Sequence, residues 1–290
     1  MIEGIVVNTL VKGGVYALLA LGFSLIFGVA RVLQLSHTAF YMLAAYGIFY
    51  FAEQLGLAPV WSITASIIIT TGIGLLTYKL FIDRVREHHA TVMLITLALA
   101  IVFQEIMLIV FTGQYRSAPA FVTGYWSILG VKVSYQNLLI LGGVLIVLGI
   151  IWVLLSKTRL GIAIRATAQD TEIANLMGIN VSTILLAVMG IATALAAVAG
   201  VLVAPTLVLE PHMLWSPFVM VMAIITLGGL GSVKGSVVGA FILAFVEVLV
   251  VYLLPTGAFL KLAVALLVMV VVLIFRPEGL FGVVFEEERL

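Results

Sequence analysis

The chain has 290 residues, of which 64% are hydrophobic and only 9% are charged, and its mean hydropathy is +1.31. A globular domain carries about 25% charged residues, so this composition indicates a membrane protein that crosses the bilayer several times. The formal net charge of +1 provides no basic face for nucleic acid. The sequence contains no cysteine, which excludes disulfides, thiol catalysis and thiolate metal sites.

Long apolar runs recur along the whole sequence and do not alternate with polar residues, which favours helices over barrel strands. The first residues lack the basic stretch and cleavage site of a signal peptide, so we expect the first span to be retained. No polar segment is long enough to form a separate domain, and we predict one all-α transmembrane domain over 1–290. The predicted spans, eight or nine in number, are 13–30, 38–53, 60–82, 91–112, 137–156, 181–204, 217–234, 235–254 and 258–275.

The span 217–234 is the weakest of the nine, because its strong apolar run, 218–227, is followed by GGLGSVKG. Helices interrupted by glycine can be half-helices that line a cavity. Small residues also recur at a spacing of four, which predicts close helix packing. The two stripes are Ala192, Ala196, Gly200 and Ala204, and Gly231, Gly235 and Gly239.

Basic residues predict the orientation, because cytoplasmic loops carry an excess of Lys and Arg. With nine spans and the N-terminus outside, ten of the 14 basic residues fall on the inner face and four on the outer face. The inner ten are Arg31, Lys79, Arg84, Arg86, Lys157, Arg159, Arg165, Lys234, Arg276 and Arg289. This orientation places the polar segment 161–180 in the cytoplasm. The longest outer loop, 113–136, contains aromatic residues that fit an interfacial belt or a docking surface for an extracytoplasmic partner.

Polar side chains inside predicted spans are candidates for a solute path, because such residues are costly in lipid and usually functional. Gln104 and Glu105 fall two-thirds along one span, and Glu247 falls deep in another. Gln34, Ser36 and His37 lie at the junction of the first two spans. The alternative for each carboxylate is a structural pair with a basic group, or a protonated group hydrogen-bonded between helices.

The segment 161–180, GIAIRATAQDTEIANLMGIN, is a polar interruption that carries Arg165, Asp170 and Glu172 within twenty residues. It predicts one short helix between Gly161 and Gly178. On such a helix the residues Ala166, Asp170, Ala174 and Gly178 form a stripe of small residues, with Ile173, Leu176 and Met177 beside it. An interfacial helix would carry Lys and Arg on its polar face, whereas this face is small and acidic. The pattern therefore favours insertion into a groove of a protein partner, with Arg165 as a charged contact or anchor.

Catalysis is not expected from this sequence. GGLGSVKGS (228–236) departs from the phosphate-binding loop, because Lys234 precedes a glycine and the spacing between the glycines is wrong. The four histidines show no metal-ligand spacing together with a carboxylate, and no nucleophile–base pair is apparent. We therefore expect neither ATP hydrolysis by this chain nor a bound cofactor.

Several of these stretches resemble permeases of the branched-chain amino acid ABC importer family. The pattern G-x-A-x-R-A-x-A-x-D-x-x-x-A-x-x-x-G-I-N is similar to the cytoplasmic coupling motif of that family. The opening 13–37, AGVLVAP (199–205), GGLGSVKGSVVGAF (228–241) and RPEGLFG (276–282) also resemble its signatures. The resemblance covers nearly the whole chain, which looks like the shorter of the two permease types.

The resemblance implies a multi-pass subunit of the inner or plasma membrane. Its expected partners are a second, homologous permease, two cytoplasmic ATPase subunits and an extracytoplasmic solute-binding protein. It implies that Arg165, Ala166, Asp170, Ala174 and Gly178 couple the pore to the ATPases. The family shows Asn-Phe-Ala-His-Gly at the first turn, where this chain has QLSHT (34–38), so the solute is open among branched-chain amino acids, urea, amides and aromatic compounds. The alternative is a secondary transporter or channel working alone, with ion-coupling carboxylates such as Glu105 and Glu247.

Overall fold

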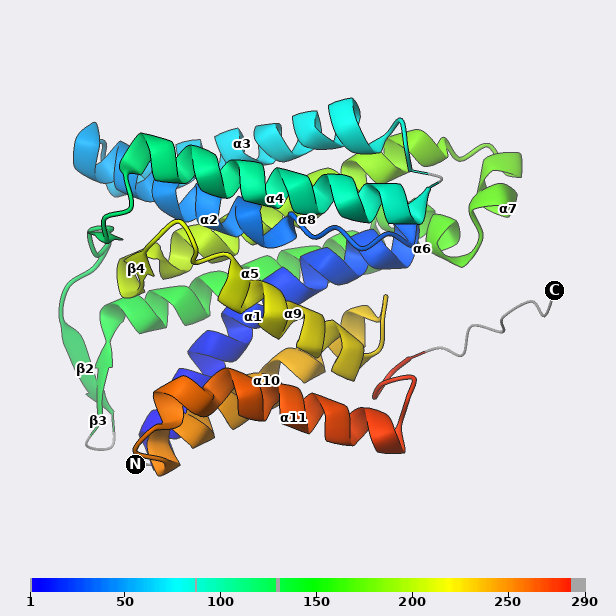
Figure 1. Ribbon diagram of the computed structural model, residues 1–290. Coiled ribbons are helices and arrows are strands. Elements are labelled where there is room, and N and C mark those ends of the chain that lie inside the picture. Colours follow the sequence, from blue (N-terminus) through cyan, green and yellow to red (C-terminus); the bar gives the residue numbers. More distant parts are fainter. Residues whose placement is uncertain (1, 87, 129–130, 283–290) are drawn as a thin grey trace.

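The computed structural model describes residues 2–86, 88–128 and 131–282, which form a bundle of helices (Figure 1). Seven helical stretches in this described part are long and apolar enough to cross a membrane, which confirms the expected all-α polytopic fold. They are α1 (Ile2–Ala30), α3 (Pro59–Thr77) continued by η2 (Tyr78–Ile82), α4 (His89–Phe111), α5 (Tyr135–Lys157), α8 (Val181–Val203) continued by η3 (Ala204–Thr206), α10 (Val233–Leu253) and α11 (Gly257–Phe275).

Two shorter helices begin inside the bundle. α2 (His37–Ile48) continues into the π-helical η1 (Phe49–Gln54), and α9 (Trp215–Gly228) has 14 residues. Segment 31–36 runs back into the bundle from the end of α1, and segment 207–214 turns inward before α9 (Figure 1). Irregular backbone at membrane depth requires such a protein environment. The described residues thus contain seven candidate spans and two shorter helices within the bundle, where the sequence predicts eight or nine spans.

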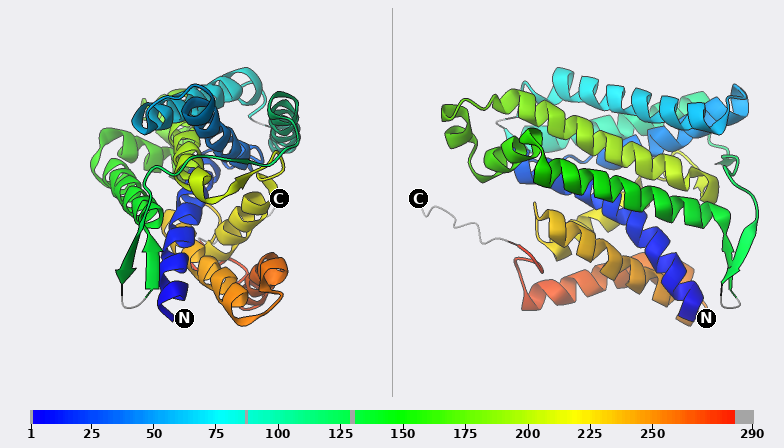
Figure 2. Two further views of the ribbon diagram at one scale, coloured as in Figure 1. Left: turned by 90° about the vertical axis from the view of Figure 1, so that its left-hand side faces the viewer. Right: turned by 180° about the vertical axis from the view of Figure 1, so that it is seen from behind.

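The bundle has two different ends. The helices α6 (Arg159–Gln169) and α7 (Thr171–Leu176) project from one end, and the antiparallel hairpin of β2 (Tyr125–Ile128) and β3 (Val131–Ser134) projects from the other (Figures 1 and 2). We call these the α6–α7 end and the hairpin end. The first helix starts at the hairpin end and α11 finishes at the α6–α7 end, as the nine-span prediction requires. Arg289, assigned to the inner face by sequence, lies outside the described residues.

A second strand pair closes the hairpin end. β1 (Arg116–Ser117) pairs antiparallel with β4 (Val208–Leu209), with Arg116 opposite Leu209. The loop after α4 is thereby tied to the segment that leads into α9. The Arg116 guanidinium also lies over the ring of Phe49, 5.7 Å from its centroid.

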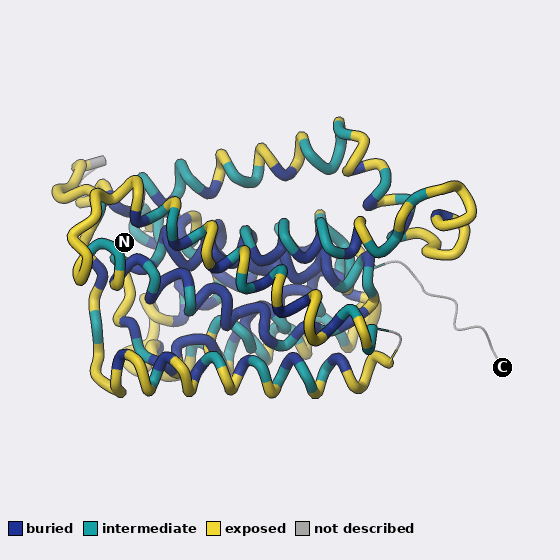
Figure 3. Tube along the Cα trace, turned by 90° about the horizontal axis from the view of Figure 1, so that it is seen from above, coloured by how far each residue is buried: buried dark blue, intermediate teal, exposed yellow. Residues whose placement is uncertain are grey.

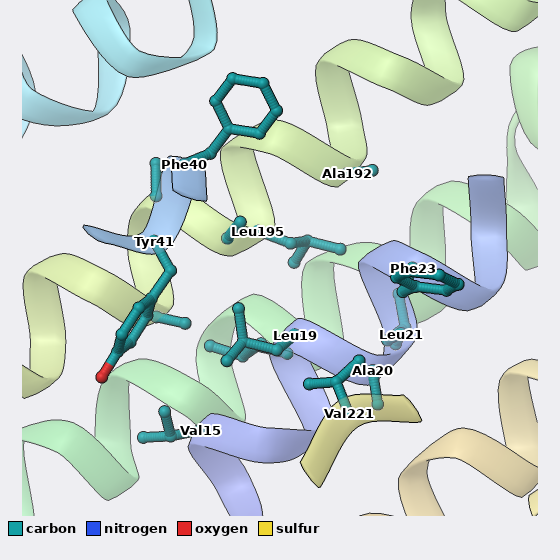
Figure 4. Packing of buried hydrophobic residues seen from close by; sticks show 14 of the residues in the cluster. Val15, Leu19, Ala20, Leu21, Phe23, Phe40, Tyr41, Ala192, Leu195 and Val221 are labelled. Carbon is teal, nitrogen blue, oxygen red and sulfur yellow. The ribbon is translucent and has the colours of Figure 1, made fainter. Parts of the chain in front are cut away.

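The core is built around residues 13–30 of α1, which are apolar on nearly all sides of the helix and therefore suited to a fully buried position. In its most apolar window 78% of the residues are buried, against 6% for α11, so α1 is central and α11 is peripheral. Figure 3 shows the buried residues gathered in the middle of the bundle and the exposed residues along its outer helices and loops. α1 packs against α5, α8, α9 and α10. Figure 4 shows Leu19 and Phe23 of α1 in one cluster with Leu195 of α8 and Val221 of α9.

Glycine allows the closest helix contacts, as the spacing-four stripes predict. A Cβ at Gly200 of α8 would overlap the carbonyl of Tyr41 on α2. Gly228 and Gly235 lie against each other's carbonyl groups where α9 crosses α10. Gly231 differs from the prediction, because it lies in the turn before α10, with φ +78, and not on the helix face.

Two predicted span boundaries are wrong. α9 ends at Gly228, six residues before the predicted limit, because Gly229 adopts φ +99, a conformation that favours glycine. α1 begins at Ile2, well before the predicted start at residue 13, because Gly13 and Gly14 are buried within the helix and do not end it. The second correction brings Lys12 inside a transmembrane helix.

Candidate functional site

The polar segment 161–180 contains two helices where the sequence predicts one. α6 ends at Gln169, and Asp170 (φ −153, ψ 117) leaves the helical conformation. Asp170 Oδ1 accepts hydrogen bonds from the backbone N–H groups of Glu172 (2.8 Å) and Ile173 (2.9 Å) and thus caps α7. A stripe with a spacing of four cannot continue through this break, so Ala166 and Ala174 do not share one helix face.

α6 is fastened to the end of α5. Thr158 Oγ1 accepts a hydrogen bond from the Gly161 N–H (3.0 Å) and donates one to the Leu154 carbonyl (2.6 Å). Gly161 lies so close to the carbonyls of Leu154 and Leu155 that a Cβ there would overlap them. Arg165 donates a hydrogen bond from its guanidinium to the Leu155 carbonyl. The arginine is therefore an anchor between α6 and α5.

α7 presents apolar side chains to the surroundings. Leu176 is 86% exposed and Met177 is 78% exposed, and Ile173 beside them is also exposed. Ala174, by contrast, is only 3% exposed, and its carbonyl accepts a hydrogen bond from the Ile179 N–H (3.0 Å). The exposed side chains of α7 include three large apolar ones, Ile173, Leu176 and Met177, which we call the α7 tip.

The flanking positions hold the pair of helices in place. Ala166 is half-buried on α6, and Gly178 ends α7 with φ +85. Asn180 Oδ1 accepts a hydrogen bond from the Thr183 N–H (3.1 Å) and caps α8. α6 and α7 are therefore joined to α5 on one side and to α8 on the other.

The junction residues Gln34, Ser36 and His37 are buried where α2 begins. His37 Nε2 contacts the Leu19 carbonyl on α1 (3.1 Å), and its ring meets Phe23 edge-on. Gln34 Nε2 donates to Ser36 Oγ (3.4 Å). Among the described residues, Gln34 Oε1, His37 Nδ1 and Thr38 Oγ1 are buried without a hydrogen-bond partner. Buried polar atoms normally have partners, so this junction has unused capacity to bind water or solute.

Gln104 and Glu105 lie together on α4, but only Gln104 is buried. Gln104 Oε1 accepts a hydrogen bond from Trp215 Nε1 at the start of α9 (2.6 Å), and Gln104 Nε2 donates to Glu105 Oε1 (3.2 Å). The Glu105 side chain is exposed on the outside of this chain. Because a bare carboxylate in lipid costs about 3 kcal/mol or more, this face of α4 requires water or another protein.

Glu247 is enclosed between three helices. Its carboxylate accepts hydrogen bonds from Lys12 Nζ (3.0 Å) and the Tyr16 hydroxyl (2.8 Å) on α1, and Lys261 Nζ of α11 lies 3.5 Å away. Its side chain is 2% exposed. The sequence singled out Glu247 but not its partners, since Lys12 and Lys261 are expected there on the outer face. This arrangement favours the structural alternative, a charge pair that joins α1, α10 and α11.

Sequence reasoning also missed Trp215, which lies 111 positions from Gln104 and has no local signal that links the two. Within the described residues, no three His, Asp or Glu side chains are grouped so that they could hold a metal ion. The polar side chains predicted from the sequence lie in three separate sets: the junction at 34–38, the pair on α4, and Glu247 with its three partners.

Comparison with known proteins assigns the chain to a family. The model of the family described as "Branched-chain amino acid transport system / permease component" matches residues 5–274. The high-affinity branched-chain amino acid transport permease BraD of Pseudomonas aeruginosa is 30% identical, over 95% of this chain and 94% of that protein. The branched-chain amino acid transport permease LivH of Escherichia coli is 25% identical, over 95% of this chain and 94% of that protein. A probable branched-chain amino acid transport permease of Methanocaldococcus jannaschii is 24% identical, over 95% of this chain and 91% of that protein.

A solved structure shares the fold. PsaBC from Streptococcus pneumoniae, in complex with Fab, superposes with a TM-score of 0.55 at 12% identity, covering 96% of this chain and 97% of the other. At this identity the likeness concerns the fold alone. The family model and the relatives cover nearly the whole sequence, and so the chain is a multi-pass membrane protein that belongs to the family of permease components of branched-chain amino acid transport systems.

Proposed function

We propose that the chain is a permease subunit of an ATP-driven importer for branched-chain amino acids or a related small polar solute. The observation that carries this proposal is the α7 tip. Its three apolar side chains are exposed at the end of a helix pair that projects from the bundle (Figure 1). Exposed apolar groups of this kind mark a docking surface, and an apolar helix face that enters a groove is a recurrent mode of protein recognition.

The proposed partner at the α7 tip is a cytoplasmic ATPase subunit, two of which would serve the complete transporter. Movement of α7 would reach the membrane through α6, because Arg165 and Thr158 hold α6 to α5, and through Asn180 at the start of α8. Ala174, which is buried, would hold α7 in place by packing on its inner side. This role replaces the direct insertion expected from the small-residue stripe, while Arg165, Ala166, Asp170, Ala174 and Gly178 stay the proposed coupling residues.

The proposed solute path runs along the face of α4 that carries Glu105. A second, homologous permease packed on this face would place the Glu105 carboxylate between the two chains, with Gln104 beside it on the inner side of α4. The junction at 34–38, with its unpartnered Gln34 and His37 atoms, lies on the other side of α4, where the Leu35 N–H donates to Thr96 Oγ1 (3.2 Å). The pair on α4 and the junction at 34–38 are therefore two separate candidate contacts for a small polar solute.

The orientation follows from this assignment. The α6–α7 end faces the cytoplasm and the hairpin end faces outward, in an inner or plasma membrane. The exposed aromatic side chains of the outer loop, Tyr115, Tyr125 and Trp126, are then available to an extracytoplasmic solute-binding protein or to the interface.

A transporter working alone is the second candidate. It would need carboxylates free to bind a coupling ion at mid-membrane. Glu247 is held by two lysines and a tyrosine, which leaves Glu105 as the carboxylate on which this candidate depends.

The α7 tip supplies the test. Leu176→Asp places a charge in the proposed docking surface, where an unpaired buried charge is costly, yet Leu176 has few contacts within this chain. We expect the ATPase subunits to be lost from the purified complex and solute uptake into reconstituted vesicles to fall at least tenfold, which corresponds to about 1.4 kcal/mol of lost binding. Thr171→Asp, also exposed at the start of α7, is the matched control and should retain both. ATPase binding and uptake unchanged by Leu176→Asp would place the docking surface elsewhere.

A further inference from the structure

We propose that the groove between α5 and α10 binds one anionic glycerophospholipid from the leaflet at the α6–α7 end. The groove has a volume of about 690 Å³, with α1 as its floor, and α5, α6 and α10 as its walls. Figure 2 shows α1 crossing between α5 and α10 in the view from behind. None of the candidate path residues on α2, α4 or α10 lines it, so this groove is separate from the proposed solute path.

The length of the groove matches one leaflet. On α1 its lining extends from Leu21 to Val29, and on α5 from Leu148 to Ser156. Eight residues of helix rise about 12 Å, and half of the hydrocarbon core of a bilayer is about 15 Å. The groove thus begins near mid-membrane and opens at the α6–α7 end, as a site for lipid chains should.

The chemistry of the groove changes along its length. Its deep part is lined by aliphatic side chains such as Leu21 and Leu148, whereas Arg165 and Lys234 lie at its mouth. An amino acid or amide would find few polar partners along such a lining, but hydrocarbon chains need none. Trp152, on the exposed side of α5, forms one edge, in keeping with the enrichment of Trp where acyl chains meet headgroups.

The charges at the mouth require an anion. Neither Arg165 nor Lys234 forms an ion pair with any described residue, and no acidic side chain lines the groove. Arg165 uses one nitrogen for the Leu155 carbonyl and keeps other N–H groups for a ligand. Basic pockets between membrane helices on the cytoplasmic side hold anionic headgroups. A lipid phosphate is therefore the complement of this mouth, and its acyl chains are the complement of the apolar part.

Binding is measured on the full chain, purified in detergent, stripped of lipid and mixed with equal amounts of phosphatidylglycerol and phosphatidylcholine. Native mass spectrometry then counts each lipid retained per chain. We expect the unaltered protein to prefer phosphatidylglycerol and Lys234→Gln to lower that preference about fivefold, the effect of one basic charge near a membrane surface. Lys157→Gln is the matched control, because Lys157 is an exposed cation at the same end that does not line the groove. An equal loss in both variants would show general surface attraction and overturn the proposal.

A second variant locates the lipid. Val238 stands on the rim of the groove and is 40% exposed, so Val238→Trp can fill the space without disturbing the core. We expect Val238→Trp to reduce the retention of both lipids. If this variant fails to fold, Trp152→Ala removes the opposite rim, and we expect it to reduce the retention of both lipids as well. The proposal is contradicted if a folded rim variant retains phosphatidylglycerol at the original level. It is also contradicted if inorganic phosphate alone displaces the lipid. The readout is bound lipid and not solute uptake. A failure of the lipid proposal is therefore distinguishable from a failure of the proposed transport function.

Discussion

At the scale of single residues, charge burial separates the two carboxylates that the sequence treats alike. Glu247 is surrounded by Lys12, Lys261 and Tyr16, whereas Glu105 accepts a hydrogen bond from Gln104 and is exposed. Removing a charge that is paired within the chain leaves its partners unpaired and destabilises the fold. A charge that is exposed on a membrane helix instead requires a partner or water from outside. The two residues should therefore respond differently to removal of the charge.

Glu247→Gln is expected to destabilise the protein by about 2 kcal/mol. The buried carboxylate would be lost, but the two lysine side chains that pair with it are 40% and 39% exposed at the surface of the chain, which places the effect between those of exposed and buried ion pairs. Thermal unfolding in detergent measures it, and Tyr252→Phe, which removes only the hydrogen bond from Asn8 (2.8 Å), is the control. A variant with unchanged stability and no uptake would instead place Glu247 in the solute path.

Glu105→Gln is expected to leave stability within about 0.5 kcal/mol, as is usual for exposed substitutions, and to reduce solute uptake. The amide keeps the size of the side chain and its contact with Gln104, so the charge alone is tested. Uptake is compared at equal amounts of assembled transporter, with Gln54→Glu on the exposed end of η1 as a control for a changed charge elsewhere. Normal uptake in Glu105→Gln would direct attention to the junction at 34–38.

At the scale of elements, the break at Asp170 gives α7 an orientation of its own. The cap supplied by Asp170 Oδ1 to two backbone N–H groups is the main local interaction that starts a helix of only six residues. Helices this short are unstable without such support. The position of the α7 tip therefore depends on this one side chain.

Asp170→Ala is expected to cost α7 about 1 kcal/mol and to speed hydrogen exchange at residues 172–177, while the membrane helices keep their protection. Uptake should fall because the α7 tip is no longer held in one position. Asp170→Asn should restore most of both properties, since Asn is also a good cap. Slow exchange in α7 of Asp170→Ala would show that packing of Ala174 alone holds the helix.

The sequence predicted the elements better than their junctions. Hydropathy located the long helices because each must satisfy its backbone internally in lipid. The break at Asp170 is visible in the local sequence, because Asp followed by Thr and Glu is typical of a helix start and unusual within a helix. The spacing of small residues, which predicts one continuous helix, does not show this break. The contacts of Trp215 with Gln104 and of Lys12 with Glu247 join residues 111 and 235 positions apart, and no periodicity in one sequence reports such pairs.

At the scale of the whole molecule, the two ends of the bundle carry different tasks in the proposed transporter. The α6–α7 end contains the two proposed coupling helices, the mouth of the proposed lipid groove and the segment 276–282, which we call the C-terminal hook. In that hook, the Leu280 and Phe281 N–H groups donate to the carbonyls of Leu227 and Gly228 (2.8 and 3.0 Å). The hairpin end gathers the strands and the exposed aromatic side chains. The proposed partners at the two ends, the ATPase subunits and the solute-binding protein, depend on which end faces the cytoplasm.

Single cysteines decide the orientation, and the absence of native cysteine leaves no background. Asn175 on α7 and Ala120 in the loop after α4 are exposed at opposite ends of the bundle, so cysteine at either position should fold normally. In intact cells, a membrane-impermeant maleimide should label Ala120→Cys and spare Asn175→Cys until the membrane is opened. The basic residues predict this result, because the α6–α7 end holds most of them. Labelling of Asn175→Cys from outside would reverse the orientation and remove the ATPase from the α7 tip, while the structure of the bundle itself would stand.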